Sequence, residues 1–323
     1  MSNFLLFIGI LFFGVPLALF LAVRLMPRTT LGLADRLAYK SLNVEQYNRS
    51  SAYNKPGFKP VHTQCTDVEL VPTATIPKDI DGVFLRNGTN LQFPETRGRY
   101  HMFNGAGMLH QVQVRNGKAS YTNVYVKTPR YSVEESAGED VYLHFGDIAG
   151  GGKAGFLRMM IAALKQRFGV IPKLDVLESG NNTTAIQFHH NKLYCLQETG
   201  YPFALEAEVE QGRLRLTGAG DFDTFNSKLD APFTAHPKID PITGDWFAFS
   251  TEFRSGNIYH SVLQKGKLAH HSIIDVQKPA PAFVHDYFLT ENYLVFPDLS
   301  LRFNPKEMFG PQQSPMVFDP AYK

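Results

Sequence analysis

Histidine is the residue type with the clearest chemical potential in this chain. It occurs 11 times, and several neutral imidazoles together would suit a redox-active divalent iron. The sequence contains no G-x-S-x-G, H-E-x-x-H, P-loop or CxxC motif, which argues against the common serine hydrolases, zincins and nucleotide-binding proteins. No two histidines are spaced i, i+4 on a convincing helical pattern. Spacing alone therefore selects no ligands, and a structural role is the default for each lone histidine.

The bulk composition excludes several classes of protein. Hydrophobic residues make up 44% and charged residues 19% of the 323 residues, which excludes disorder for most of the chain. Lys+Arg 32 against Asp+Glu 30 leaves no basic field across the whole protein, so we expect no nucleic-acid partner. The two cysteines, Cys65 and Cys195, are too few for a disulfide scaffold or for a set of zinc-binding thiolates.

The amino-terminal end is apolar. Residues 4–23 form a run of 20 residues without a charged side chain, and a helix of that length spans about 30 Å, the hydrocarbon thickness of a bilayer. A cleaved signal peptide would need a basic residue before a shorter apolar stretch and a cleavage site after it. Here Arg24 and Arg28 follow the run, so we favour a membrane anchor over a signal peptide or a buried soluble helix. Residues 1–28 are predicted to be this single-pass anchor with its basic flank, residues 29–71 a linker and entry segment, and the positive-inside rule places the remaining domain in the cytoplasm.

Most of the remaining sequence predicts short strands. Apolar and polar residues alternate in runs such as 118–126 and 192–197, and turn signals such as Asn116-Gly117 separate the runs. Long helical patterns are nearly absent, which favours an all-β fold and, among such folds, a β-propeller. About twelve strands at four per blade give about three blades, below the usual minimum of four. Either the count is low, the fold is a sandwich, or the propeller is incomplete.

One segment, residues 155–169, interrupts the β pattern with a helical one. Its apolar residues fall on one stripe, and its basic residues lie elsewhere. The stripe consists of Leu157, Ile161, Leu164 and Phe168. It could pack on the β domain, or it could enter a membrane interface while the basic side chains meet lipid headgroups.

Four tracts resemble a known family. Residues 81–110 contain DGVFLRNGTN and RYHMFNGAGMLH, and residues 181–202 contain KLYCLQETGYP. They are followed by APFTAHPKIDPITGDWFAF at 231–249 and by FVHDYFLTENYLVFPD at 283–298. In their order and in their residues these tracts resemble the carotenoid cleavage oxygenase family. The resemblance extends from about residue 72 to the end. The resemblance implies a seven-bladed β-propeller with a ferrous ion on its axis, held by four histidines, that activates dioxygen to cleave a polyene double bond into two carbonyl products.

The resemblance also implies roles for three residues. His236 in T-A-H-P-K matches the first iron ligand of the family, and His285 in V-H-D-Y matches the second. Glu198 in L-Q-E-T matches a carboxylate that accepts a proton from a ligand imidazole, which fixes the tautomer and raises the basicity of the ligand. In the family the segment that matches 155–169 docks on membrane beside the tunnel mouth, so the resemblance favours that role here.

Several positions depart from the family pattern. Family members usually carry aspartates around the glycines of the segment Asn104-Gly105-Ala106-Gly107, and Thr89 stands where proline is common. His101 and His110 are expected to be non-ligands, and the pairs 189–190 and 270–271 alternate between the faces of a strand, so we assign them no role. The third and fourth ligand histidines are expected beyond the last residue. We therefore expect a fragment of an active enzyme, and this chain alone to bind iron poorly and to be inactive.

These observations lead to one main hypothesis and two alternatives. The main hypothesis is an iron(II)-dependent dioxygenase that takes a carotenoid or apocarotenoid, with O2, from the lipid bilayer. The first alternative keeps the fold but changes the reaction, to retinoid isomerisation or to cleavage of a stilbene-type alkene. The second is a non-enzymatic, membrane-anchored β-propeller that has lost the metal. The sequence leaves the substrate, the cleaved bond and the oligomeric state open.

Overall fold

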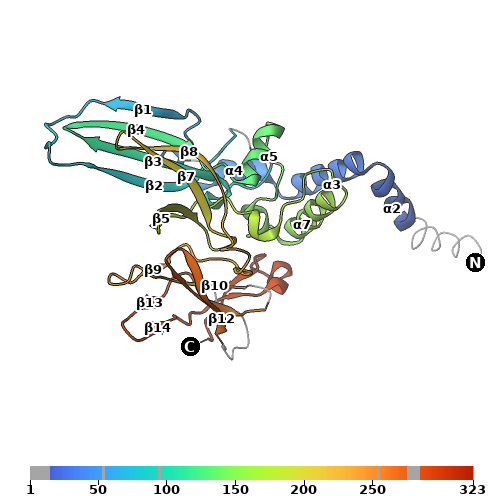
Figure 1. The fold of residues 1–323 in the computed structure, drawn as a ribbon. Helices are drawn as coiled ribbons and strands as arrows, with labels where there is room; N and C mark the ends of the chain where they lie inside the picture. Colours follow the sequence, from blue (N-terminus) through green and yellow to red (C-terminus); the bar gives the residue numbers. More distant parts are fainter. Residues whose placement is uncertain (1–14, 53–54, 94–95, 253–254, 275–283, 323) are drawn as a thin grey trace, which may run out of the picture.

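The computed structural model describes residues 15–52, 55–93, 96–252, 255–274 and 284–322 (Figure 1). Three sheets of four antiparallel strands contain most of the strands in this part of the chain. The first has the order β1-β4-β3-β2 and consists of β1 (Cys65–Leu70), β2 (Gly82–Asn90), β3 (Ala106–Arg115) and β4 (Lys118–Tyr125). The second consists of β5 (Ala185–His189), β6 (Lys192–Leu196), β7 (Phe203–Glu210) and β8 (Arg213–Phe222) in sequential order.

The third sheet repeats the sequential order and is followed by two short hairpins. It contains β9 (Lys238–Ile239), β10 (Trp246–Thr251), β11 (Ile258–Gln264) and β12 (Lys267–Ile274). The first hairpin pairs β13 (Phe288–Leu289) with β14 (Leu294–Val295), and the second pairs β15 (Leu301–Phe303) with β16 (Met316–Phe318). Strands β4 and β6 lie within the runs 118–126 and 192–197, where the alternation of the sequence predicts strands.

Tight turns set the register of the hairpins. In the β3–β4 turn, Asn116 and Gly117 have φ values of 52° and 75°, and two consecutive residues at positive φ are typical of the type I′ turn that matches strand twist. Gln211-Gly212 and Lys265-Gly266 repeat this backbone in the β7–β8 and β11–β12 hairpins. The turn signals predicted from sequence at these places are therefore confirmed.

Apolar side chains join each sheet to the next one along the chain. Leu109 and Val124 of the first sheet share a buried cluster with Phe203 of the second. Tyr194 of the second sheet shares another with Trp246 of the third, which is wholly buried. A smaller cluster joins the third sheet to the segment around β13. Successive four-stranded sheets packed face to face are the arrangement of propeller blades, so the predicted β-rich fold is confirmed, whereas the number of seven blades stays a prediction.

The prediction that long helices are nearly absent is wrong. Residues predicted to be a linker form α3 (Pro27–Ser41) and α4 (Val44–Ser50), and β1 of the same stretch joins the first sheet. Two of the missed helices carry sequence signals at their ends. Proline occupies the first turn of α3, and α5 (Pro129–Ala137) has Thr128 as its N-cap and Gly138 at a φ of 70° as its C-cap. The segments that connect the sheets also contain short helices: α6 (Phe145–Ile148), η3 (Pro56–Phe58), η4 (Met102–Asn104), η5 (Val176–Glu178) and η6 (Pro305–Phe309).

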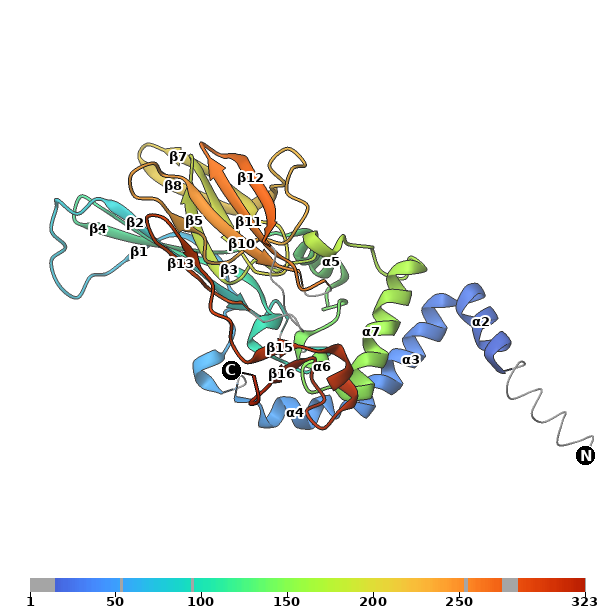
Figure 2. The ribbon, with the colours of Figure 1, turned by 90° about the horizontal axis from the view of Figure 1, so that it is seen from below.

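The predicted helix at 155–169 is confirmed as α7 (Gly152–Arg167). It lies beside α3 at one end of the molecule (Figure 2). Its predicted apolar stripe is not presented as one surface, because Ile161 is only 3% exposed whereas Leu157 is 49% exposed. Leu164 and Phe168 are intermediate. The expectation that all four side chains reach a membrane together is therefore corrected for Ile161, which is buried in the protein.

Only part of the predicted anchor lies within the described residues. Residues 1–14 fall outside them, and α2 (Val15–Leu25) contains the rest. Among the described helices, none is by itself both long and apolar enough to cross a membrane. The segments Leu17–Leu25 and Pro27–Ser41 satisfy the length and composition test only as a pair, bent by 117°.

Candidate functional site

The three residues that the family resemblance singles out meet at one place. Glu198 lies just after β6, His236 just before β9, and His285 just before β13. Each therefore comes from a different sheet, at a strand end where the packed sheets converge. Their ligand atoms lie within 4.8 Å of one another, and within the described part of the chain no other cluster of three or more His, Cys, Asp or Glu side chains meets this criterion.

The contacts within this trio follow a definite order. His236 Nε2 and His285 Nε2 lie 3.2 Å apart, and Glu198 Oε1 lies 2.9 Å from His285 Nδ1. A carboxylate at Nδ1 favours the tautomer with the proton on Nδ1, which leaves Nε2 of the same ring as an electron-pair donor. Glu198 thus contacts the far side of the His285 ring, away from His236. This is the geometry of a carboxylate that orients a ligand rather than of a ligand itself.

Buried neighbouring residues fix the positions of the two imidazoles. Ala235 is wholly buried beside His236, and the hydroxyl of Thr234 accepts a hydrogen bond from the backbone N–H of His236. Around His285, Val284 and Tyr287 are buried at 5% and 2% exposure, and the Tyr287 hydroxyl donates to the carbonyl of Phe247. With its neighbours held in the core, the side chain of His285 is left 56% exposed.

Two residues that the sequence analysis did not single out connect the histidine segments. Lys238 Nζ lies 2.7 Å from Asp286 Oδ1, and it also lies 5.5 Å from the centre of the Tyr287 ring. Both residues stand within the tracts that carry the family resemblance, in T-A-H-P-K and V-H-D-Y. Opposite charges one or two positions from the two histidines were the signal that could have identified them. This ion pair is a second link between the segments, besides the contact of the two imidazoles.

The electrostatic environment keeps His236 neutral. Burial and then the neighbouring His285 lower the pKa of His236, against the opposing charges of Asp286 and Glu198. Because its ordinary pKa is about 6.5, the imidazole is uncharged near neutral pH. A neutral imidazole can donate an electron pair to a metal.

The donor set fits a metal ion. Two nitrogen ligands at right angles, each about 2.1 Å from one ion, would lie about 3 Å apart, close to the 3.2 Å between the two Nε2 atoms. Two imidazoles, one of them backed by a carboxylate, suit a divalent transition metal such as iron. The structure thus brings His236, His285 and Glu198 together in an arrangement that could hold such an ion.

Other histidines have partners elsewhere. His110 Nδ1 lies 2.6 Å from the Tyr121 hydroxyl, and the His101 ring packs 4.8 Å from that of Phe103. His189 is buried and stacks on Trp246 at 4.4 Å, whereas its neighbour His190 is exposed at a turn. His270 and His271 contact Ser272 and Ser261. None of these histidines joins the trio.

Comparisons with known sequences match most of the chain. Residues 58–323 match the family described as retinal pigment epithelial membrane protein. The Arabidopsis thaliana protein named carotenoid 9,10(9',10')-cleavage dioxygenase 1 is 33% identical over 307 residues, which cover 92% of this chain and 54% of that relative. A chloroplastic 9-cis-epoxycarotenoid dioxygenase of Oryza sativa subsp. japonica is 32% identical over 275 residues, covering 78% of this chain and 40% of that relative. The chain thus spans about half the length of the curated relatives it matches.

Solved structures share the fold. Pseudomonas brassicacearum lignostilbene dioxygenase aligns with a TM-score of 0.64 at 25% identity, over 84% of this chain and 52% of that one. A Synechocystis apocarotenoid oxygenase variant aligns with a TM-score of 0.58 at 21% identity, over 82% of this chain and 53% of that one. The second likeness, at its low identity, concerns the fold alone.

Proposed function

This chain belongs to the carotenoid oxygenase family, the family of the retinal pigment epithelial membrane protein, and from that membership we propose that it is part of an iron(II)-dependent dioxygenase. Its substrate would be a carotenoid or apocarotenoid, of which one conjugated C=C bond is cleaved by O2 into two carbonyl products. The names of the curated relatives support the carotenoid class of substrate. Because the chain spans about half of those relatives, this is a proposal for the whole protein.

The observation that carries the proposal is the contact of His236 with His285 at 3.2 Å. These two imidazoles would hold the iron, whose chemistry when bound is the activation of dioxygen toward an alkene. Glu198 accepts the Nδ1 proton of His285 and so keeps the opposite ring nitrogen available. Lys238 and Asp286 hold the two histidine segments at a fixed separation. Two further imidazoles, and the remaining blades of a seven-bladed propeller, belong to the same proposal by family resemblance.

Metal binding by single-residue variants tests the site directly. Anaerobic iron(II) titration of this chain should detect weak binding, and His285→Ala should abolish it. His62→Ala is the matched control, because His62 is exposed and lies outside the trio. The His285 side chain is 56% exposed, so its removal should leave the thermal midpoint nearly unchanged. Equal iron retention by the His285→Ala variant and by the unaltered chain would mean that the ligand assignment is wrong.

Product analysis tests the reaction. A protein that joins this chain to the remaining blades of the proposed propeller should convert an apocarotenal to two carbonyl compounds in an iron-dependent manner, with label from ¹⁸O₂ in the products. Full iron occupancy without turnover would favour another reaction, and cleavage of a stilbene is the first to assay because of the likeness to lignostilbene dioxygenase. Retinoid isomerisation is the second reaction to assay. If the protein neither bound iron nor turned over substrate, the non-enzymatic membrane-anchored propeller would be favoured.

Membrane attachment is part of the proposal, because a long hydrocarbon substrate resides in a bilayer. The described part of the apolar run exposes Leu17, Leu19 and Phe20 at 58%, 58% and 55%, and Leu157 of α7 is also exposed. Arg24 and Arg28 follow the run, which supports a cytoplasmic location of the catalytic domain. Deletion of residues 1–24 should shift the protein toward the soluble fraction, and residual membrane binding would implicate the exposed part of α7. No shift at all would contradict the anchor.

A further inference from the structure

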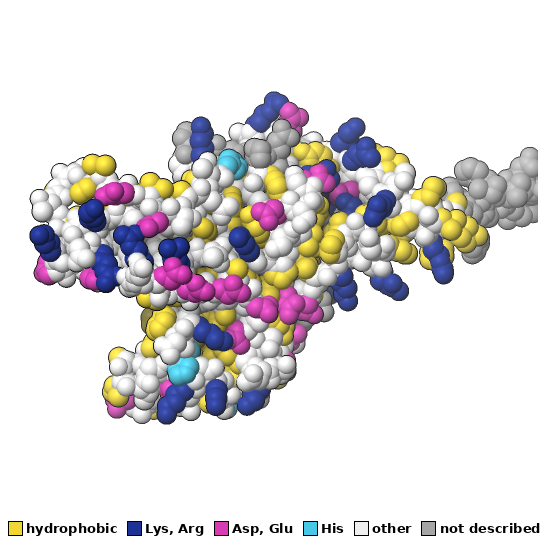
Figure 3. Space-filling model, turned by 45° about the horizontal axis from the view of Figure 1, so that its top comes forward, with side chains coloured by type: hydrophobic (Ala, Val, Ile, Leu, Met, Phe, Trp, Pro, Cys, Tyr) yellow, Lys and Arg dark blue, Asp and Glu magenta, His cyan; other side chains and the backbone are white. Residues whose placement is uncertain are grey.

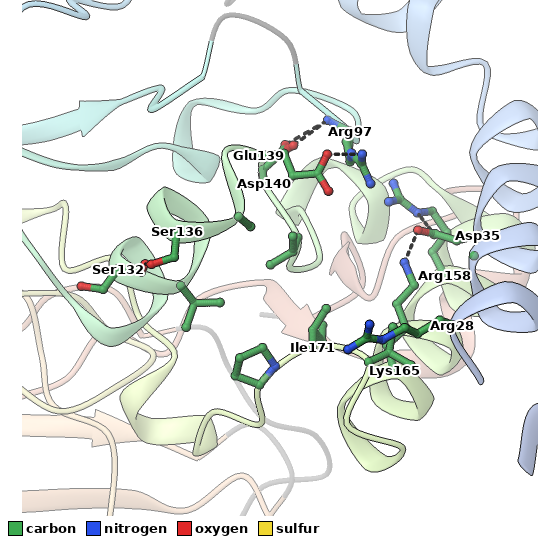
Figure 4. A pocket seen from close by; sticks show the side chains of 16 residues that line it. Arg28, Asp35, Arg97, Ser132, Ser136, Glu139, Asp140, Arg158, Lys165 and Ile171 are labelled. Atoms are coloured by element: carbon green, nitrogen blue, oxygen red, sulfur yellow. Dashed lines mark hydrogen bonds and ion pairs between the residues drawn. The ribbon is translucent and has the colours of Figure 1, made fainter. Parts of the chain in front are cut away.

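A second concave site lies away from the histidines, among the helices. It is a cleft of about 760 Å³ between α3, α5 and α7, closed on its remaining sides by the segments around Arg97 and Ile171 (Figure 4). This volume is in the range of sites that bind small molecules. None of its lining residues belongs to the trio of Glu198, His236 and His285.

The walls of this helical cleft differ in polarity. One wall carries Arg28 and Asp35 of α3 together with Arg158 and Lys165 of α7 (Figure 4). The other wall is mixed, because α5 contributes Ser132 and Ser136 as well as Val133 and Ala137. Glu139 and Asp140 follow α5 in the lining, and Asp140 accepts hydrogen bonds from the backbone N–H of Arg97. Val141 and the run Val170, Ile171 and Pro172 are apolar. An apolar strip beside charged side chains suits an amphipathic ligand whose head is charged.

Most of the charges in the cleft neutralise one another. Asp35 lies 3.1 Å from Arg158 and 2.5 Å from Lys165, and Arg97 pairs with Glu139. Among the described residues, Arg28 is the lining cation that makes no ion pair, and it is exposed. The cleft therefore offers a positive charge that an incoming anion could bind without displacing an internal partner.

The surroundings of Arg28 add to this attraction. Arg28 lies in the first turn of α3, which contains no acidic residue. Residues 15–41 and α7 together contain eight Lys or Arg and one acidic residue, Asp35, in a chain whose net charge is only +2. Basic and apolar side chains lie together over this end of the molecule (Figure 3).

From these observations we propose that the helical cleft binds the phosphate headgroup of an anionic phospholipid of the membrane to which the protein is attached. The phosphate contacts Arg28, and the glyceryl part lies along the apolar side chains of Val133, Ala137 and Ile171. The exposed apolar side chains of α2, next to this site in the chain, lie in the same bilayer. This inference rests on the proposed membrane attachment and adds the lipid that the attachment selects.

Vesicle flotation of the full chain separates the two proposals. Binding to vesicles of pure phosphatidylcholine measures the contribution of the apolar anchor. The gain in bound protein when phosphatidic acid is added measures recognition of the headgroup. Arg28→Gln should reduce that gain about fivefold, the effect of one basic residue at a lipid surface, and should leave binding to phosphatidylcholine unchanged. Arg36→Gln is the matched control, because Arg36 is an exposed arginine of the same helix that does not line the cleft. Equal losses from both variants would mean diffuse attraction and would overturn the proposal.

A second variant fills the cleft and keeps every charge. Gly32 lines the cleft from α3 and has open space where a side chain would begin, and a larger residue there also favours the helix. Gly32→Leu should therefore remove the gain from phosphatidic acid while the protein stays folded by circular dichroism. An unaltered gain would overturn the proposal. Soluble glycerol 3-phosphate should compete only weakly, and competition at the same concentration as the lipid would assign the cleft to a free phosphate ester instead.

Discussion

The trio of Glu198, His236 and His285 and the ion cluster of Asp35, Arg158 and Asp147 differ chiefly in their exposure to water. In the trio, the His285 side chain is 56% exposed and that of Glu198 is 23% exposed. In the ion cluster, the side chains of Arg158 and Asp147 are 7% and 0% exposed, at a distance of 2.6 Å. Both groups join segments that are remote in the chain, but the trio leaves its nitrogen ligand atoms accessible, whereas the contact of Arg158 with Asp147 is closed to solvent.

The fold depends on the two groups to different degrees. Burial raises the pKa of Asp147 despite the nearby charge of Arg158, which indicates how strongly this carboxylate depends on its partner. Burial also acts to raise the pKa of Asp35, but the hydrogen bond from Lys165 and the charges of Arg158 and Lys165 lower it overall. Charges this deeply buried require all their partners to be present. The exposed trio can lose a member at little cost to folding.

The largest predicted effect is on the stability of the ion cluster. Arg158→Leu leaves Asp147 and Asp35 without their shared cation, and breaking a buried ion pair in this way costs about 3–5 kcal/mol of unfolding free energy. Denaturant unfolding followed by circular dichroism measures the loss. Arg167→Leu on the exposed side of α7 is the control and should change stability by about 0.5 kcal/mol or less. If the two variants were equally stable, the contrast between the buried and the exposed group would fail.

The next effect concerns metal affinity at the trio. Glu198→Gln keeps the size of the side chain but removes the charge that supports His285, and loss of such a partner lowers metal affinity about 10–100-fold. Anaerobic cobalt(II) or iron(II) titration measures it. Glu206→Gln, an exposed change on β7, should have no effect on affinity. Equal affinity of the Glu198→Gln variant and the unaltered chain would show that Glu198 does not orient the ligand.

The smallest effect concerns the ion pair of Lys238 with Asp286. At 31% and 49% exposure it should contribute about 0.2–1 kcal/mol to stability, because solvent screens such pairs. Lys238→Asp or Asp286→Lys alone should weaken metal binding a few-fold, and the double exchange should restore it. The control reverses the charges of the exposed pair of Arg213 with Asp67, which lie 2.6 Å apart, and should leave metal binding unchanged. If the double variant bound metal as weakly as either single variant, the ion pair would have no role in spacing the histidines.

Local sequence patterns predicted a large part of the fold. The alternation of residues in β4 and β6 and the glycine turns at Gly117 and Gly266 depend on neighbours a few positions apart, and such patterns can be recognised without a structure. The helices α3 and α5 were missed although Pro27 and Thr128 stand at their starts. A cap marks where a helix can begin, but most helical stability comes from tertiary packing, such as that of the buried Leu31 and Ala38 of α3.

The candidate site was predicted by resemblance rather than by spacing. Composition and spacing could not choose His236 and His285 among 11 histidines, and His189 would have been as good a candidate on those grounds. Lys238 and Asp286 were overlooked, because the ion pair joins residues that are 48 positions apart in the chain. The helical cleft gave no sequence signal at all, since Asp35 and Arg158 are separated by 123 positions.

Many of the strands, their turns, the apolar amino-terminal end and the family can be recognised from the order of the residues alone. Which polar groups meet depends on the folded arrangement. Turn and strand propensities act over a few residues, so they fix where a side chain points relative to its own strand. The contact of His236 with His285, and of Asp35 with Arg158, depends instead on how the apolar faces of whole sheets and helices pack. That packing leaves His285 accessible to a ligand and buries the contact of Arg158 with Asp147 within the fold.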